Sequence, residues 1–263
     1  MNLKKGIVKI EMYSELYSVF LTFLSWLTPV ITGLAILVFG IIIAASPVQS
    51  TRFLGVGFIF TAVNGLLASV NSFSMRYIGV EQVAKNSVLF SAVGMLFSIM
   101  SLVFICVFIH KNYGIRLIYL PLLLIQTGGI VIDRLVAVLL TRALGAGHKN
   151  VMWVNLVILI DDFVISSVIS IIIILVFWKY RESEKVIPKA YLVRTVVLLC
   201  GVLTTGITVA IYLQSIFDSA SVINGETLSM LNGIVSRGVA LIFPLYVFVM
   251  VIKASKNKPV ETE

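Results

Sequence analysis

VILIDDFVISSVISIIIILVF, residues 157–177, places two adjacent aspartates inside a run that is otherwise largely apolar. A water-soluble protein keeps carboxylates at its surface, where water solvates them. This run is long and apolar enough to cross the roughly 30 Å hydrocarbon core of a bilayer. It therefore predicts a transmembrane helix with Asp161 and Asp162 near its middle, where each carboxylate needs a partner.

The composition of the whole chain indicates the same class of protein. Of its 263 residues, 59% are hydrophobic and 12% are charged, and its mean hydropathy is +1.08. Soluble domains carry about 25% charged residues. A net charge of +8 fits loop lysines and arginines that face anionic lipid, and no basic cluster with interleaved aromatics predicts nucleic-acid binding. We therefore expect an integral membrane protein in contact with the lipid bilayer.

Seven apolar runs of transmembrane length follow one another along the chain. They are too long and too continuous for the alternating strands of a membrane barrel. We predict an all-α bundle of seven transmembrane helices, as one domain over residues 1–252 with a short polar cytoplasmic tail at 253–263. The expected helices lie within 18–46, 53–75, 87–110, 116–140, 151–178, 191–217 and 228–252.

The basic residues between these runs predict the orientation, because cytoplasmic loops are enriched in lysine and arginine. One set of loops and flanks holds eleven: Arg52, Lys111, Arg116, Lys179, Arg181, Lys185, Lys189, Arg194, Lys253, Lys256 and Lys258. The other set holds seven: Lys4, Lys5, Lys9, Arg76, Lys85, Arg142 and Lys149. We expect the N-terminus outside and the C-terminus inside, in the plasma membrane.

Polar residues recur near the middle of five runs, at Asn64, Gln126, Asp161, Asp162, Thr204, Thr205 and Arg237. For the charged members this is a depth of roughly 15 Å, where a charge costs about 2.5–3.5 kcal/mol. We expect Arg237 to pair with Asp161 or Asp162. Adjacent helical residues point in different directions, so the second carboxylate needs an amide, a threonine, water or a proton.

This polar layer has two interpretations. A buried ion pair with amide neighbours can fix helix register and specify the fold. Alternatively, the same groups form a ligand-binding site or a switch, for which the candidates are Asp161, Asp162, Arg237, Gln126, Asn64 and Thr204.

No enzyme motif is found in the sequence. It contains no phosphate-binding loop, CxxC pair or HExxH. The two histidines, His110 and His148, are expected on opposite sides of the membrane and cannot share a metal. Because Asp161 and Asp162 are adjacent, they differ from the separate helices that supply the aspartates of an intramembrane protease. We expect neither catalysis nor a metal or cofactor.

Two stretches resemble serpentine, G-protein-coupled receptors of the chemosensory type. DRLVAV (133–138) is similar to that family's acidic-Arg-aromatic signature, and FPLYVFVMVIKASK (243–256) is similar to the end of its last helix. The second stretch departs from the family where Phe243 replaces Asn and Val247 replaces Tyr. A retinal protein is disfavoured, because 228–252 contain no lysine for a Schiff base.

The resemblance implies a receptor or sensor for a small extracellular stimulus. A cytoplasmic protein partner would then contact the loop 179–190 and the C-terminal tail. One alternative is a secondary transporter in which Asp161 or Asp162 carries the coupling proton and Arg237 holds an anionic substrate. A second alternative is an accessory or structural membrane subunit.

Overall fold

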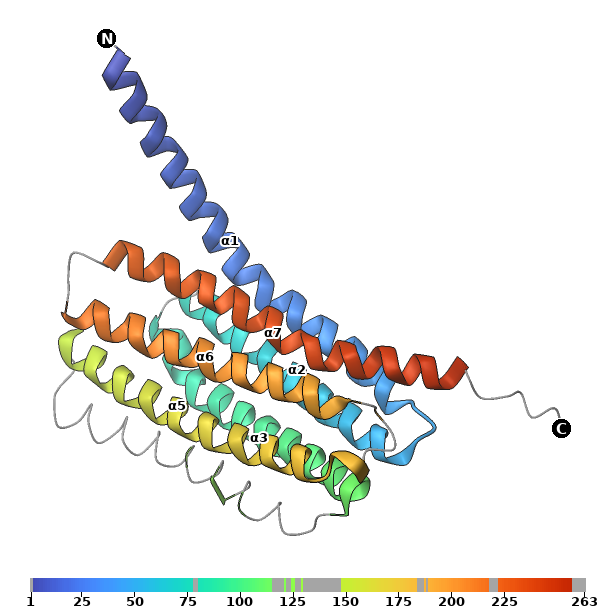
Figure 1. Cartoon of the computed structure of the whole chain (residues 1–263). Coiled ribbons are helices and arrows are strands. Elements are labelled where there is room, and N and C mark those ends of the chain that lie inside the picture. Colours follow the sequence, from blue (N-terminus) through green and yellow to red (C-terminus); the bar gives the residue numbers. More distant parts are fainter. Residues whose placement is uncertain are drawn as a thin grey trace.

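The computed structural model describes residues 2–77, 80–114, 148–183, 187, 189–217 and 222–256, and also 121, 124, 125 and 129. Apart from a short 3₁₀ turn, η1 (Arg181–Ser183), the elements in this part of the chain are long α-helices (Figure 1). They are α1 (Asn2–Ala44), α2 (Gln49–Tyr77), α3 (Val80–Tyr113), α5 (His148–Lys179), α6 (Ala190–Phe217) and α7 (Val222–Lys256).

Five of these helices are long and apolar enough to cross a membrane. The predicted runs 18–46, 53–75, 87–110, 191–217 and 228–252 each overlap one of these five candidate spans, which agrees with a helical membrane bundle. The run 151–178 is helical in α5, whose described apolar part is the shorter Phe163–Lys179. The run 116–140 lies almost wholly outside the described residues, so the count of seven helices stays a prediction. The five spans are Val19–Ala44, Gln49–Val70, Val93–Tyr113, Ala190–Gln214 and Met230–Ala254.

The helices extend beyond the predicted apolar runs at several places. Helix α1 begins at Asn2 and continues through Pro29, so the residues before the first run are also helical. Helix α7 continues to Lys256 and includes the start of the predicted polar tail. A depth measured from the edge of an apolar run therefore differs from a depth measured along the folded helix.

Helices α3 and α5 run in the same direction through the bundle. Helix α3 ends at the side of the bundle where α5 and α7 also end, whereas α5 begins at the opposite side (Figure 1). Residues 115–147 separate these two helices in the sequence, and their number suffices for a transmembrane helix of about 20 residues. The seventh helix stays a prediction.

The helices form a curved row in the order α3, α2, α1, α7, α6, α5, in which each contacts the next. Glycine allows the closest of these contacts, between α1 and α2. A Cβ atom on Gly55 would lie 2.7 Å from the carbonyl oxygen of Gly40 and nearer still to the backbone nitrogen of Ala44. Small residues at helix crossings let backbones approach closely in membranes.

The ends of the row meet through the edge-to-face rings of Tyr113 in α3 and Phe177 in α5, whose centroids lie 5.4 Å apart. Within the described part of the chain, the hydrophobic core is concentrated at this end of the bundle, where each of the six described helices begins or finishes (Figure 1). Its fully buried members include Ile43, Leu54, Ile109 and Val247.

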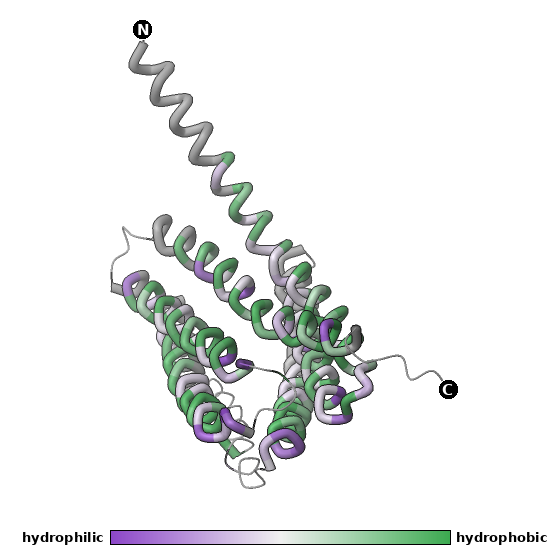
Figure 2. Tube along the Cα trace, turned by 45° about the vertical axis from the view of Figure 1, so that its right-hand side comes forward, coloured by the Kyte–Doolittle hydropathy of each residue, from purple (hydrophilic) through white to green (hydrophobic). Residues whose placement is uncertain are grey.

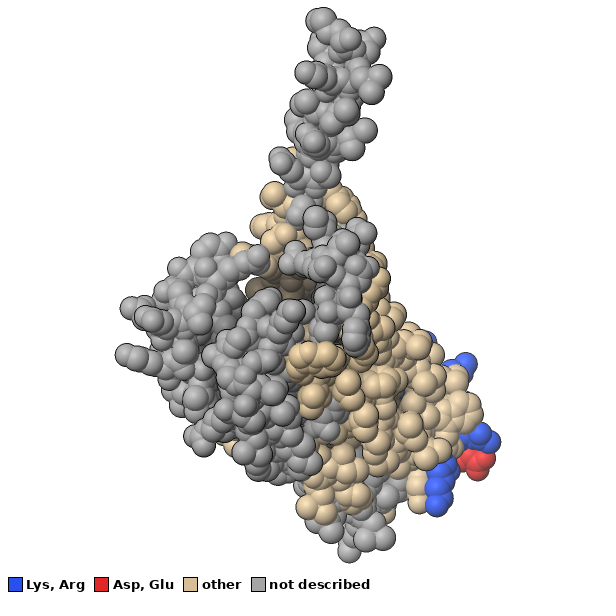
Figure 3. All heavy atoms as spheres, turned by 90° about the vertical axis from the view of Figure 1, so that its left-hand side faces the viewer, with Lys and Arg blue, Asp and Glu red and all other residues tan. Residues whose placement is uncertain are grey.

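We call this side of the molecule the basic end, because six exposed cations lie there: Arg52, Lys111, Lys179, Arg181, Lys189 and Lys253. Figure 3 shows charged atoms, blue and red, gathered at one edge of the face in view. These six cations belong to the set of loops and flanks that is richer in lysine and arginine. The sequence analysis predicts that this set is cytoplasmic.

Few residues of each candidate span are fully buried. No more than 28% of the residues in any of the five are buried, and the spans consist mainly of apolar residues (Figure 2). Leu175, Leu203 and Val235 are examples of large exposed apolar side chains. In water such a surface would aggregate, whereas in a bilayer lipid tails cover it.

Candidate functional site

Two polar seams join neighbouring helices inside the bundle. The first joins α2 to α3, where the Asn64 amide donates a 2.9 Å hydrogen bond to Ser98 Oγ. One turn closer to the basic end, the hydroxyls of Thr61 and Ser101 lie 2.7 Å apart, and Ser101 also donates to the backbone oxygen of Gly57 at 3.0 Å. Asn64 is therefore engaged with a neighbouring helix.

The second seam joins α6 to α7. The Asn232 amide donates 2.7 Å hydrogen bonds to the backbone oxygen of Thr204 and to Thr208 Oγ1. Thr204 is buried, and its own hydroxyl donates to the Gly201 carbonyl within α6. The sequence analysis missed Asn232, although an amide inside an apolar run is itself a signal.

Both seams lie at a similar depth. Asn64 is 15 residues from the start of α2, and Thr204 is 14 residues from the start of α6, which places each about 20 Å from the basic end. The predicted layer therefore contains Asn64 and Thr204 at one level. Gln126 lies outside the described residues.

The two aspartates occupy backbone positions in α5 at this level, and their side chains lie outside the described part of the structure. The adjacent Phe163 fixes the register, because its ring would lie 3.2 Å from a Cβ atom on Gly206 of α6. Positions 161 and 162 are therefore close to the level of Gly206 and Thr208.

Arg237 lies at a different level from the α6–α7 seam. It is five residues beyond Asn232 in α7, or about 7.5 Å nearer the basic end, and its side chain is exposed. Helical periodicity places it on the face of α7 that carries Met230 and Phe248, which contact α1. An arginine side chain leans toward the N-terminal end of its helix and spans part of the axial offset. Pairing with Asp161 or Asp162 stays a prediction.

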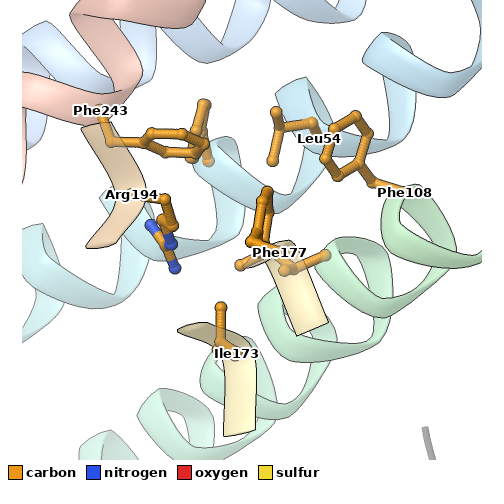
Figure 4. A pocket seen from close by; sticks show the side chains of 8 residues that line it. Leu54, Phe108, Ile173, Phe177, Arg194 and Phe243 are labelled. Atoms are coloured by element: carbon orange, nitrogen blue, oxygen red, sulfur yellow. The ribbon is translucent and has the colours of Figure 1, made fainter. Parts of the chain in front are cut away.

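A different cation lies inside the bundle. Arg194, which the sequence places among the loop cations, belongs to the second turn of α6. Its guanidinium lies 4.7 Å from the centroid of the Phe243 ring and points into a small pocket (Figure 4). The pocket is formed by α2, α3, α5, α6 and α7, and its other lining residues are Leu54, Phe58, Ile105, Phe108, Ile173 and Phe177.

No metal-binding arrangement of three or more His, Cys, Asp or Glu side chains occurs among the described residues. Cys106, in α3, is fully buried, and Cys200, in α6, is partly buried. The chemistry available in the described part is thus hydrogen bonding in the two seams and one inward-facing guanidinium.

These features define a multi-pass helical membrane protein. No protein family model matches the chain, and neither a curated protein nor a solved structure shows significant similarity to it. Of the two stretches that resemble serpentine receptors, 243–256 lies in α7 and 133–138 lies outside the described part.

Proposed function

We propose that the protein is a receptor or sensor for a small stimulus that arrives from the side opposite the basic end. The observation that carries this proposal is the asymmetry of the bundle. Among the residues whose side chains the structure describes, the core is concentrated at the basic end, and the polar layer at Asn64 and Thr204 lies about 20 Å away from it.

A stimulus at the polar layer would act on the helix contacts described above. The seams consist of a few hydrogen bonds between neighbouring helices, such as those from Asn232 to Thr204 and Thr208. A polar ligand that competes for these groups changes the pairing of α6 with α7. Helix α7 continues from this seam to the basic end, where a cytoplasmic partner would contact 179–190 and the tail.

A secondary transporter is the alternative. It is supported by the backbone level of positions 161 and 162 in α5, which is close to that of Gly206 and Thr208 in α6. A structural subunit is the third possibility, supported by the fact that Asn64 and Asn232 both bond to neighbouring helices.

The three functions differ in how water reaches the layer. Thr205 is a suitable probe, because helical periodicity places it on the same inward face of α6 as Arg194, eleven residues earlier. A Thr205→Cys variant is made with Cys200→Ala, and the fully buried Cys106 stays in place. A membrane-impermeant thiol reagent is applied separately to each side of the membrane.

The receptor predicts labelling of Thr205→Cys only from the side opposite the basic end. Labelling from both sides would favour a transporter, and no labelling from either side would favour a structural subunit. Leu203→Cys is the matched control, because Leu203 is 64% exposed on the outer surface of the same helix and lipid should shield it from the reagent.

A further inference from the structure

Arg194 is a charged side chain inside the bundle that does not belong to the polar layer at Asn64 and Thr204. It is half-buried, and within the described residues it forms neither an ion pair nor a hydrogen bond. Its contact is with the Phe243 ring. The other pocket residues are apolar, with rings from Phe58, Phe108 and Phe177.

This environment is unfavourable for an isolated cation. A guanidinium stays charged in proteins and has five N–H donors. A cation–π contact compensates only part of the hydration that is lost on burial. The space next to the guanidinium lies between Ile173, Phe177 and Phe243 (Figure 4), so an occupant there contacts the charge and the aromatic walls together.

The surroundings favour an anion as this occupant. Arg194 is only four residues from the start of α6 at the basic end, or about 6 Å deep. Exposed cations, including Arg52, Lys111 and Lys189, lie at the same end and raise the local concentration of anions. The N-terminus of α6 adds a favourable dipole for negative charge.

We infer that the Arg194 pocket binds a small anionic group that enters from the basic end. The small size of the pocket limits this group to a halide, a carboxylate or one oxygen-bearing part of a lipid headgroup. Its charge neutralises Arg194, and the site thereby holds α6 against α2, α3, α5 and α7. The protein's packing at the basic end becomes dependent on the anion.

The test measures thermal unfolding of the purified full chain in a neutral detergent. Sodium chloride, acetate and gluconate are compared at constant ionic strength, and phosphatidylglycerol is compared with phosphatidylcholine in mixed micelles. At about five times the dissociation constant, a bound anion raises the midpoint by about 2–4 °C. A rise with chloride or acetate indicates a free ion, and a rise with phosphatidylglycerol alone indicates a headgroup.

Arg194→Met should abolish the anion-dependent rise, because it fills the pocket without charge. Arg181→Met is the matched control and should keep the rise, since Arg181 also lies over a ring, 5.9 Å from Trp178, but is exposed. If Arg194→Met does not fold, Arg194→Lys should require about tenfold more anion, because lysine cannot form a bidentate contact. An unchanged anion response in the folded Arg194 variant, or no response of the wild type to any anion, would overturn the inference.

Discussion

The side-chain amide of Asn232 in α7 lies 2.7 Å from the backbone oxygen of Thr204 in α6. The same oxygen accepts a 3.0 Å hydrogen bond from Thr208, so one carbonyl serves both its own helix and the neighbouring one. Within the described residues this is the clearest polar link between α6 and α7, and it identifies the level at which those helices are joined.

The first prediction concerns this link. Asn232→Ala should destabilise the protein by about 1 kcal/mol, because interhelical hydrogen bonds in membranes contribute about 0.6–2 kcal/mol. Unfolding in mixed micelles with increasing sodium dodecyl sulfate measures the change. Ser236→Ala, one turn further along α7, is the control, and an equal effect of the two substitutions would show that the amide bond adds nothing.

The second prediction concerns the crossing of α1 and α2. Gly55→Ala should destabilise by about 1–3 kcal/mol or prevent folding, because the new methyl group meets backbone atoms of Gly40 and Ala44 that cannot move aside. Gly65→Ala in the same helix has no atom within 4 Å of its new Cβ and should stabilise by up to about 1 kcal/mol. The two variants are compared by yield and unfolding midpoint, and equal behaviour would exclude close packing at Gly55.

The third prediction tests the charged members of the polar layer. Arg237→Asp should lower the yield of folded protein, because it leaves several carboxylates in the membrane without a cation. The yield of monodisperse protein should recover when Asp161→Arg or Asp162→Arg is added, and only one of the two should restore it fully. Failure of both double variants would remove the pairing of Arg237 with α5.

The fourth prediction concerns orientation. If the basic end is cytoplasmic, Lys253→Cys should react with an impermeant thiol reagent only after the cells are opened. Gln214→Cys, at the other end of the bundle and exposed, should react in intact cells. The reversed pattern would place the N-terminus inside.

The sequence was sufficient to locate most helices. An apolar run of about 20 residues has few alternatives to a membrane span, so 18–46 and 191–217 could be assigned from composition alone. The ends of helices were less predictable, since polar residues at a membrane surface can continue a helix. Helix α7 begins at Val222, before the apolar run at 228, so a depth measured from the edge of that run differs from one measured along the helix.

The partners of side chains were the least predictable feature. Asn64 and Thr204 were expected in a polar layer and lie in the two seams. Which neighbouring helix each side chain bonds to depends on how its own helix is rotated about its axis. A continuous apolar run gives little information about that rotation. For the same reason Arg194 was counted only among the basic residues that flank the predicted helix 191–217, whereas its guanidinium lies inside the bundle against Phe243.

The central claim is that packing at the basic end holds the bundle closed there. The most direct test is the distance between spin labels at Lys111 in α3 and Lys253 in α7, both exposed at that end, measured by double electron–electron resonance in lipid nanodiscs without added ligand. We predict a single narrow distance distribution. Two well-separated populations would contradict the account, because they would show that the basic end opens spontaneously, as a carrier with alternating access requires.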